Sequence, residues 1–497
     1  MMHYLLDLVR FVWIILAYSM VPSVVRGIAS TATPNVIFAM ADDLGWGDVE
    51  YNNGSAFTPS LNEMARSDNA ILLQRHYSGS PVCSPTRATL LTGRNHNRYC
   101  VWNSNNAGGS LKDFIRPQKM PLPLSEITVA EVMRNAGYST AFFGKWHLGD
   151  FKPLRRRGNN TLSHPGLHGF EQWWATGRSA PTATTNCGCF QNSTCILGHY
   201  TDRPMCTNYY TNTSDGIVGW PQPIPGDDSH FIWSLAEKYI REQVNLQKPF
   251  FLYLPFHSVH KPYIATDQYR EIYLKAKMKY TSKEADYYGA ISAMDEALGK
   301  LRNLLQELGI KNNTLFWFTS DNGPLKPRST NGLRGRKSSL YEGGVRVPGI
   351  IEWPDVISSN RVSQFPVVSS DLLPTVQDIL GVKPSDDRPI DGISILPFLQ
   401  GKENKRNQPI FSAFKLKKRR VFQEQYRVSI TTDKYKLMET VRNNTVQYEL
   451  FDLEKDARES SNLINDYPDI TSQLIEQIEQ WKESVRQSIK KIGCNIL

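Results

Sequence analysis

The segment Val36-Ile37-Phe38-Ala39-Met40-Ala41-Asp42-Asp43 places two carboxylates directly after an uninterrupted apolar run. The run is short and contains β-branched and aromatic residues, which is typical of a buried strand. Further runs of this kind occupy residues 140–143, 249–256, 315–319 and 347–351. We therefore expect five buried strands, the first of which ends at an acidic pair.

Helical patterns lie between these runs. Thr128-Val129-Ala130-Glu131 has the arrangement of a capping box, and Gly137 is the matching stop signal. A second helix is expected over residues 230–244, and residues 283–308 place apolar side chains three and four positions apart. Strands that alternate with helices predict an α/β fold, in which a large, mostly parallel sheet is sandwiched by helices.

The pattern changes near residue 400, where a polar, turn-like segment begins. Beyond it we expect antiparallel strands at residues 426–430, 435–439 and 448–450, followed by an amphipathic helix over residues 470–489. These patterns predict a main α/β domain over residues 34–400. A smaller α+β domain, with an antiparallel sheet and a helix, is expected over residues 401–497.

Polar side chains follow four of the five predicted strands. They are Asp42 and Asp43 after the first, Gly144-Lys145-Trp146-His147 after the second, His257 and His260 after the third, and Ser320-Asp321-Asn322-Gly323 after the fourth. In an open α/β sheet the ligand site lies beyond the carboxyl ends of the strands. The chain therefore predicts one site to which four strands deliver charged or metal-binding groups.

A separate segment, Cys83-Ser84-Pro85-Thr86-Arg87, precedes a run of good helix formers. Ser84 resembles an N-cap and Pro85 a first-turn residue, which puts Cys83 at a helix N-terminus where unpaired amide groups favour an anion. Taken alone, the segment fits a reactive cysteine and a buried or disulfide-bonded cysteine equally well.

The N-terminus has the pattern of a secretory signal peptide. Arg10 precedes the uncharged run 11–25, and small residues follow, so we expect a signal peptide over residues 1–29, with a retained signal anchor as the alternative. The run is short for a membrane span and no later run is longer, so no transmembrane anchor is expected. Six N-x-S/T sequons then predict a glycosylated surface: Asn53, Asn159, Asn192, Asn212, Asn312 and Asn443.

The seven cysteines are consistent with export, because an oxidising compartment permits disulfides. Four of them lie close together in one segment, which predicts a loop crosslinked by local disulfides: Cys187, Cys189, Cys195 and Cys206. Zinc is weakly supported there because no histidine lies at ligand spacing. If Cys100 and Cys494 join the disulfides, Cys83 is left over.

The formal net charge of the 497-residue chain is +9, which favours anionic partners. The densest basic clusters, at residues 155–157 and 415–420, fit solvated loops or contact with a polyanion. Nucleic acid is not expected as the partner of an exported glycoprotein. The destination within the secretory pathway, lysosomal or extracellular, and the oligomeric state are not encoded in a local motif.

The residue types at the strand ends suit a metal and an oxyanion. Asp42, Asp43, Asp321 and Asn322 offer oxygen ligands, which fit Ca²⁺ or Mg²⁺ better than zinc. Beside a divalent cation, the positive charges of Lys145, Lys337 and Arg87 suit a charged oxyanion ester. His147 and His260 can transfer protons, and Cys83 is the candidate nucleophile.

With its continuation Leu91-Thr92-Gly93-Arg94, the Cys83 segment resembles the signature of the type I sulfatases, in which the cysteine of C-x-P-x-R is converted to Cα-formylglycine by the formylglycine-generating enzyme. The resemblance extends to Pro34-Asn35-Val36, Asp42-Asp43-Leu44-Gly45-Trp46-Gly47-Asp48, Gly144-Lys145-Trp146-His147-Leu148-Gly149, Ser320-Asp321-Asn322-Gly323, Leu333-Arg334-Gly335-Arg336-Lys337, Glu342-Gly343-Gly344 and Glu449-Leu450-Phe451-Asp452-Leu453. It covers nearly the whole chain after the predicted signal peptide. It implies an alkaline-phosphatase-like sulfatase fold and is closest to the arylsulfatase group that includes the galactosamine 6-sulfatases.

The resemblance implies a role for each site residue. Formylglycine at Cys83, hydrated to a gem-diol, would attack sulfur and then release sulfate by elimination. Asp42, Asp43, Asp321, Asn322 and the modified residue 83 would hold one Ca²⁺. Arg87 and His147 would position the diol, Lys145 and Lys337 would bind sulfate, and His260 would bind substrate and protonate the leaving oxygen.

The choice of His260 rests on Ser258-Val259-His260-Lys261-Pro262, because the family's histidine lies just before a proline. His257 is then substrate-facing or structural, and the reverse assignment is the alternative. Ordinary loop residues or pocket-lining residues are the two interpretations of His164, His168, Arg178, Tyr200 and Arg203.

The function implied is calcium-dependent hydrolysis of a sulfate ester, with a sulfated carbohydrate or an aryl sulfate as substrate. One alternative is a phosphate or phosphonate monoester hydrolase of the same superfamily, although a two-metal phosphatase should show further His and Asp ligands. The other is a sulfated-glycan-binding protein without turnover, against which the complete set of catalytic positions argues.

Overall fold

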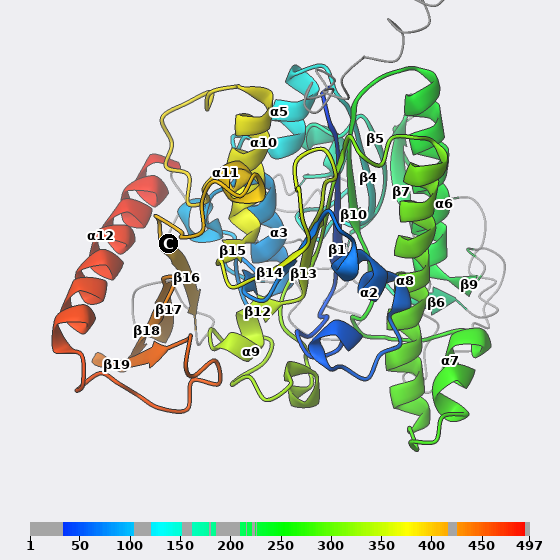
Figure 1. Ribbon diagram of the computed structural model, residues 1–497. Coiled ribbons are helices and arrows are strands. Elements are labelled where there is room, and N and C mark those ends of the chain that lie inside the picture. Colours follow the sequence, from blue (N-terminus) through cyan, green and yellow to red (C-terminus); the bar gives the residue numbers. More distant parts are fainter. Residues whose placement is uncertain are drawn as a thin grey trace, which may run out of the picture. The chain divides into compact units, whose positions relative to one another are not determined.

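The computed structural model describes residues 33–103, 121–151, 162–177, 180–184, 209–214, 216–220, 224, 226–415 and 425–492 (Figure 1). Residues 34–497 belong to one compact unit. The predicted signal peptide, the four loop cysteines, Cys494, the cluster at 155–157 and most of the cluster at 415–420 lie outside the described residues. Within those ranges no helix is both long and apolar enough to cross a bilayer.

A ten-stranded sheet forms the centre of the unit. Its strand order is β14 (Arg361–Ser363), β2 (Ala70–Leu73), β13 (Gly349–Glu352), β11 (Thr314–Ser320), β1 (Asn35–Ala41), β10 (Phe250–Pro255), β4 (Ser139–Lys145), β5 (Gln172–Thr176), β7 (Tyr210–Thr213) and β8 (Gly216–Gly219). The five neighbours from β11 to β5 are parallel, whereas β13, β7 and β8 join in antiparallel fashion. The predicted α/β class is confirmed, and the antiparallel edges make the sheet mixed.

Alternate side chains of β1 enter two separate cores. Ile37 and Ala39 pack toward the helices α2 (Pro59–Arg66), α6 (Asp228–Asn245) and α8 (Ser282–Glu307). Val36, Phe38 and Met40 pack toward α3 (Cys83–Thr92), α5 (Val129–Asn135) and α10 (Leu372–Leu380). Because both faces of the strand are buried, its sequence is apolar without alternation.

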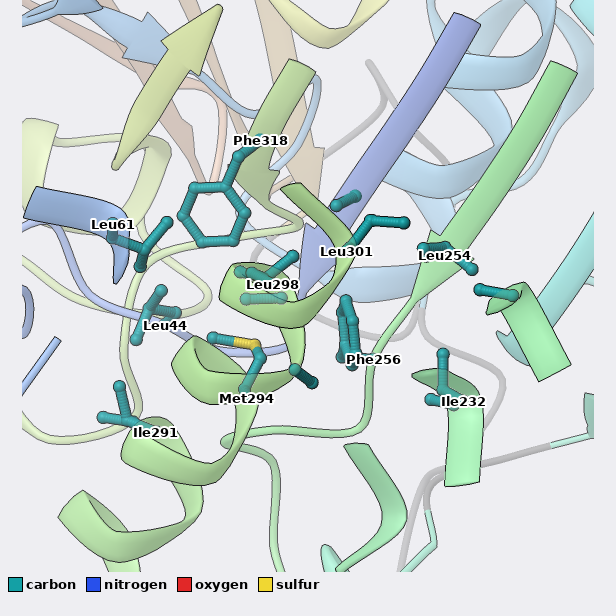
Figure 2. Packing of buried hydrophobic residues seen from close by; sticks show 14 of the residues in the cluster. Leu44, Leu61, Ile232, Leu254, Phe256, Ile291, Met294, Leu298, Leu301 and Phe318 are labelled. Atoms are coloured by element: carbon teal, nitrogen blue, oxygen red, sulfur yellow. The ribbon is translucent and has the colours of Figure 1, made fainter. Parts of the chain in front are cut away.

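The first core is built mainly on α8. Met294, Leu298 and Leu301 project from this helix toward Phe256 and Phe318, which belong to the sheet side of the core (Figure 2). Thr281 caps the helix through a capping box with Glu284. The predicted capping box of Thr128 and Glu131 at the start of α5 is likewise confirmed.

The predicted strand at residues 347–351 is divided by Pro348. Arg346–Val347 forms β12, which pairs with β3 (His76–Tyr77), whereas β13 pairs with β11 in the large sheet. Proline has no N–H to donate to a ladder, so the chain leaves one sheet and enters the other at this residue.

The chain ends in a four-stranded antiparallel sheet and one long helix. The strands are β16 (Ile410–Lys415), β17 (Gln425–Thr431), β18 (Tyr435–Arg442) and β19 (Thr445–Asp452), and the helix is α12 (Pro468–Ile492). Leu474, Ile478 and Val485 of the helix share a core with the sheet. The sequence predicted three of these strands and the helix but missed β16.

Short elements complete the described chain. They are η1 (Glu50–Asn52), η2 (His96–Tyr99), η3 (Pro165–His168), η4 (Pro327–Thr330), η5 (Ser369–Asp371), β6 (Ala183–Thr184), β9 (Gly226–Asp227), β15 (Val367–Val368), α7 (Asp267–Leu274), α9 (Glu342–Val345) and α11 (Leu396–Leu399).

Candidate active site

The carboxyl ends of the parallel strands form one polar cluster, as predicted. Ala41 at the end of β1 pairs with Ser320 at the end of β11, so the acidic pair and the Asp321-Asn322 pair leave the sheet side by side. The cluster, which we call the Cys83 cluster, contains Asp42, Asp43, Cys83, Arg87, Lys145, His147, His260, Asp321, Asn322 and Lys337. All ten are predicted site residues.

Backbone hydrogen bonds and unusual conformations hold the loops of the cluster. Asp42 N–H donates to Ser258 O at 2.8 Å, and Asp43 N–H donates to a carboxylate oxygen of Asp321 at 3.1 Å. Asp43 and His147 have positive φ angles of 62° and 58°. Such conformations are costly for side-chain-bearing residues and tend to occur where a site requires them.

Cys83 is the first residue of α3, with Val82 as the N-cap. The prediction that Ser84 caps the helix is therefore wrong, and its hydroxyl instead donates to His147 O at 2.7 Å. Cys83 is buried and free, whereas Cys100 is disulfide-bonded. The disulfide interpretation of Cys83 is thereby excluded, and its sulfur stays available at the helix N-terminus.

Three cations match the three carboxylates around Cys83. Lys145 Nζ lies 2.5 Å from Asp42 Oδ2, and Lys337 Nζ lies 2.5 Å from Asp43 Oδ1. Arg87 donates from Nε and Nη2 to Asp321 Oδ2 at 3.0 and 2.7 Å. These side chains are almost entirely buried, and buried charges are tolerated only when paired in this way.

The sulfur of Cys83 contacts both signs of charge. Its thiol donates to Asp42 Oδ1 at 3.4 Å, and Lys337 Nζ donates to the sulfur at 3.3 Å. Burial, together with Asp321, raises the pKa of the thiol well above its ordinary value. The unmodified thiol is therefore protonated at neutral pH and a poor nucleophile.

The carboxylates of the cluster differ in their proton affinity. Burial favours the neutral form of Asp42, but Lys145 and the other cations outweigh it and hold its pKa well below the usual range. Burial and the charge of Asp42 raise the pKa of Asp321 to about 6. Burial also lowers the pKa of His260 to about 4. Burial and the charge of Lys145 lower the pKa of His147 well below its ordinary value.

The carboxylate and amide oxygens of the cluster are the donor atoms that suit a hard divalent cation. One ligand atom each from Asp42, Asp43, Cys83 and His260 can be chosen so that all lie within 4.8 Å of one another. Asn322 Nδ2 donates to Asp43 Oδ1 at 2.6 Å, while Asn322 Oδ1 is buried and has no hydrogen-bond partner. A buried carbonyl oxygen of this kind requires a donor or a cation, so the predicted oxygen set is suited to Ca²⁺.

The two histidines after β10 have different surroundings. His260 Nε2 lies 3.8 Å from Asp43 Oδ2, and its side chain is 23% exposed. His257 is fully buried, with Nδ1 hydrogen-bonded to Asp228 at 2.7 Å and Nε2 to Thr176 at 2.7 Å. His260 therefore belongs to the Cys83 cluster, and His257 to a separate network.

The remaining predicted residues lie away from the cluster or outside the described chain. His164 stacks on Trp173, and His168 lies against Trp146, so both serve packing. Arg178, Tyr200 and Arg203 fall outside the described residues, as do Asn159 and Asn192. The other four sequon asparagines, Asn53, Asn212, Asn312 and Asn443, are exposed.

Two groups of residues around the site were missed from the sequence. Thr176 and Asp228 partner His257, and Lys436 reaches Glu342 near the Lys337 loop. A lysine inside the otherwise apolar run Tyr435-Lys436-Leu437-Met438 was the only local signal for the second group. No local pattern marks the first.

Comparisons with known proteins identify the family of the chain. Residues 34–382 match the family model of the sulfatases, and residues 336–484 match the model described as N-sulphoglucosamine sulphohydrolase, C-terminal. The chain is 33% identical to N-acetylgalactosamine-6-sulfatase of Rattus norvegicus, an alignment that covers 74% of this chain and 66% of that protein. It is 28% identical to arylsulfatase A of Homo sapiens, over 93% of this chain and 89% of the relative.

A similar fold occurs in solved structures. The crystal structure of Ps i-CgsB matches with a TM-score of 0.73 at 23% identity, covering 93% of this chain and 98% of the other. At this level of identity the match concerns the fold alone.

Proposed function

The chain belongs to the sulfatase family of sulfuric ester hydrolases, and we propose that it hydrolyses sulfate esters of carbohydrates by means of a formylglycine formed from Cys83 and a bound Ca²⁺. One observation carries the proposal. The free, buried sulfur of Cys83 lies 3.4 Å from Asp42 Oδ1 and 3.3 Å from Lys337 Nζ, at the point where the strand ends converge.

The position of Cys83 suits a modified nucleophile. A formylglycine here would supply, as its hydrate, one hydroxyl to attack sulfur and a second to release sulfate by elimination. Residue 83 begins α3, whose unpaired N–H groups favour the developing negative charge. Arg87 on the next turn is fixed by Asp321 and by Lys145 O, so its charge is pre-oriented toward the same region.

Lys145 and Lys337 are the proposed sulfate-binding residues. Both ammonium groups lie next to carboxylates that contact Cys83, and Lys337 also contacts the sulfur itself. The two ammonium groups can therefore donate charge-assisted hydrogen bonds to the negatively charged oxygens of a bound sulfate ester.

His147 and His260 are the proposed proton-transfer residues. The low pKa of each imidazole leaves it neutral at pH 7, so each can accept a proton from a hydroxyl at residue 83 or from water. His260 is the partly exposed one and is proposed to face the leaving oxygen, to which it donates when protonated. His147 lies within the cluster and is proposed to assist the release of sulfate.

A Ca²⁺ ion would be held by Asp42, Asp43, Asp321 and Asn322, with residue 83 beside them. When bound, it supplies charge stabilisation for the sulfate oxygens. The buried, unpartnered Asn322 Oδ1 is the support for this assignment in the structure. Treatment with a chelator is expected to abolish turnover, and Ca²⁺ is expected to restore it better than Zn²⁺.

The maturation of the protein is proposed from its sequence. Residues 1–29 would be removed as a signal peptide, the formylglycine-generating enzyme would act on Cys83, and the exposed sequons would carry glycans. The mature protein would be lysosomal or extracellular. Residues 34–400 are proposed as the catalytic domain and residues 401–497 as a C-terminal domain within the same compact unit.

The proposal is tested by co-expressing the full chain with a formylglycine-generating enzyme and assaying a generic aryl sulfate beside the matching aryl phosphate. Turnover of the sulfate that is absent from Cys83→Ala supports the proposal. Turnover of aryl phosphate without any sulfate ester would instead identify a phosphoesterase, and binding of sulfated glycans without turnover would identify a binding protein. A panel of defined sulfated glycans then identifies the natural substrate.

A further inference from the structure

The loop that carries Lys337 is attached to the C-terminal sheet rather than to the large sheet alone. We define the Lys337 segment as residues 333–344, which follow η4 and include the first three residues of α9. Its lysine contacts Asp43 and Cys83, as described above. Residues on either side of the lysine contact β18, β19 and the loop that follows β19.

The first attachment is a buried ion triad. Lys436 Nζ of β18 lies 2.9 Å from Glu342 Oε1 and 2.9 Å from Glu459 Oε1. Glu459 Oε2 also accepts a hydrogen bond from Glu342 N–H at 2.6 Å. All three side chains have no exposed surface. Glu342 Oε2 also accepts a hydrogen bond from Tyr77 OH at 3.0 Å and lies 3.7 Å from Arg346 Nη1, so the triad fixes Glu342 together with these two residues.

The second attachment is Glu449 of β19. Its carboxylate accepts hydrogen bonds from Arg334 Nη1 at 3.1 Å and from Tyr341 OH at 2.5 Å. The Arg334 guanidinium lies 3.8 Å from the centre of the Tyr341 ring, so the two ends of the segment are held together. Phe451 of β19 also packs against the ring of Tyr341.

The triad is linked mechanically to Lys337 through two glycines. A Cβ on Gly343 would lie 2.5 Å from Gly335 O, and a Cβ on Gly344 would lie 2.0 Å from Ser339 O. The backbone next to Glu342 therefore rests directly on the backbone on either side of Lys337. Because there is no empty space at these two contacts, a displacement of Glu342 must also move the backbone of the Lys337 segment.

We infer that the C-terminal sheet is part of the catalytic apparatus, and that Lys436 is a positioning residue that fixes Lys337 against Asp43 and Cys83 through Glu342. The inference rests on the proposed role of Lys337 in binding the sulfate group. It assigns to this sheet a function beyond covering the core.

The test is a double-mutant cycle on the full-length, formylglycine-bearing protein. Lys436→Met is expected to lower kcat/KM for an aryl sulfate, per folded molecule, by between about tenfold and 100-fold, mainly through KM. In a Lys337→Ala background the same change is expected to have an effect of less than about twofold. Lys436→Arg, which keeps the charge, is expected to restore part of the loss.

Lys482→Met is the matched control. Lys482 is also a buried lysine of the C-terminal domain, but it pairs with Glu439 at 3.0 Å and touches no residue of the Lys337 segment in the contacts described. It is expected to lower stability while leaving kcat/KM per folded molecule unchanged. Glu449→Gln, a milder change at the second attachment, serves if Lys436→Met does not fold.

Hydrogen exchange separates this inference from the proposed function. In Lys436→Met or Glu449→Gln, amides of residues 333–344 are expected to exchange faster than in wild type, and in Lys482→Met at the wild-type rate, whether or not the protein turns over sulfate esters. Equal loss of kcat/KM with and without Lys337, or unchanged exchange in this segment, would overturn the inference. Absence of wild-type turnover with the expected exchange pattern would overturn only the proposed function.

Discussion

Two buried polar clusters lie at the carboxyl edge of the large sheet, and they differ in how completely their atoms are satisfied. In the Cys83 cluster, three carboxylates and three cations crowd around one sulfur, and Asn322 Oδ1 has no partner. In the network of His257, both ring nitrogens are bonded, and Asp228 also accepts a hydrogen bond from Tyr209 OH at 2.7 Å.

This difference distinguishes a binding site, the Cys83 cluster, from a structural network, that of His257. Thr176 lies opposite Lys145 in the register of β5 and β4, so the two clusters are neighbours on one sheet edge. The network of His257 connects α6, β5 and the end of β10 and leaves nothing for a ligand to bind. The Cys83 cluster retains a buried acceptor without a partner, Asn322 Oδ1, which is expected of a preorganised binding site.

The largest expected effect is that of Cys83→Ala. If the Cys83 cluster is the catalytic centre, removing the nucleophile lowers kcat by about 10⁴-fold or more. The fold should persist, because alanine fits the first turn of α3. The measurement is aryl sulfate turnover with thermal unfolding as the control, and activity equal to wild type would contradict the mechanism.

Next in size is the effect of His260→Ala. Loss of a general acid is expected to lower kcat by roughly 10²- to 10⁴-fold, with a smaller loss for substrates whose leaving group needs no protonation. Because this side chain is partly exposed, unfolding should be little affected. A normal kcat of His260→Ala on both kinds of substrate would show that another residue protonates the leaving oxygen.

His257→Phe should show the opposite pattern. The substitution leaves Asp228 buried without its ring partner, so the free energy of unfolding is expected to fall by about 3 kcal/mol. Turnover per folded molecule should stay within about twofold of wild type. Denaturant unfolding and active-enzyme titration together check this, and a large loss of kcat at normal stability would reverse the assignment of the two histidines.

A smaller effect is expected at Asp48, a buried carboxyl outside both clusters, which accepts hydrogen bonds from Gly45 N–H and Tyr287 OH. Burial raises its pKa to about 7, above the value expected in the unfolded chain. A raised pKa gives stability that is present at low pH and is lost as pH rises through the folded value.

As the pH rises from 5 to 7, the ionisation of Asp48 is therefore expected to lower the free energy of unfolding of the wild type by about 2 kcal/mol. Asp48→Asn, which does not titrate, should flatten the dependence of stability on pH over that range. Denaturant unfolding at both pH values measures the difference. Equal slopes for the two proteins would show that Asp48 is ionised in the folded state.

The parts of the fold and site that are local in the chain were predictable. A buried strand and the polar residue that follows it are neighbours in sequence, so Asp42, Lys145, His260 and Asp321 could be assigned to one sheet edge before the structure was known. The capping box of α5 depends on four consecutive residues and was predicted for the same reason. The similar box of Thr281 and Glu284 at the start of α8 was not predicted.

The parts that depend on distant partners were not predictable. Ser84 is a residue type favoured at N-caps, but its hydroxyl donates to His147 O on another loop, and the helix begins two residues earlier than predicted, at Cys83. Thr176 and Asp228 come from elements far apart in sequence, as do Lys436 and Glu342. Pro348 changes the sheet to which its strand belongs, which is decided by tertiary pairing rather than by propensity.

The central claim is that residue 83 acts as a formylglycine, and its modification state can be measured together with activity. Preparations made with and without a formylglycine-generating enzyme are digested, and the peptide containing residue 83 is quantified by mass in its thiol and aldehyde forms. Aryl sulfate turnover should rise in proportion to the aldehyde fraction and vanish where only the thiol is present. Full turnover by protein that carries only the cysteine thiol would contradict the account.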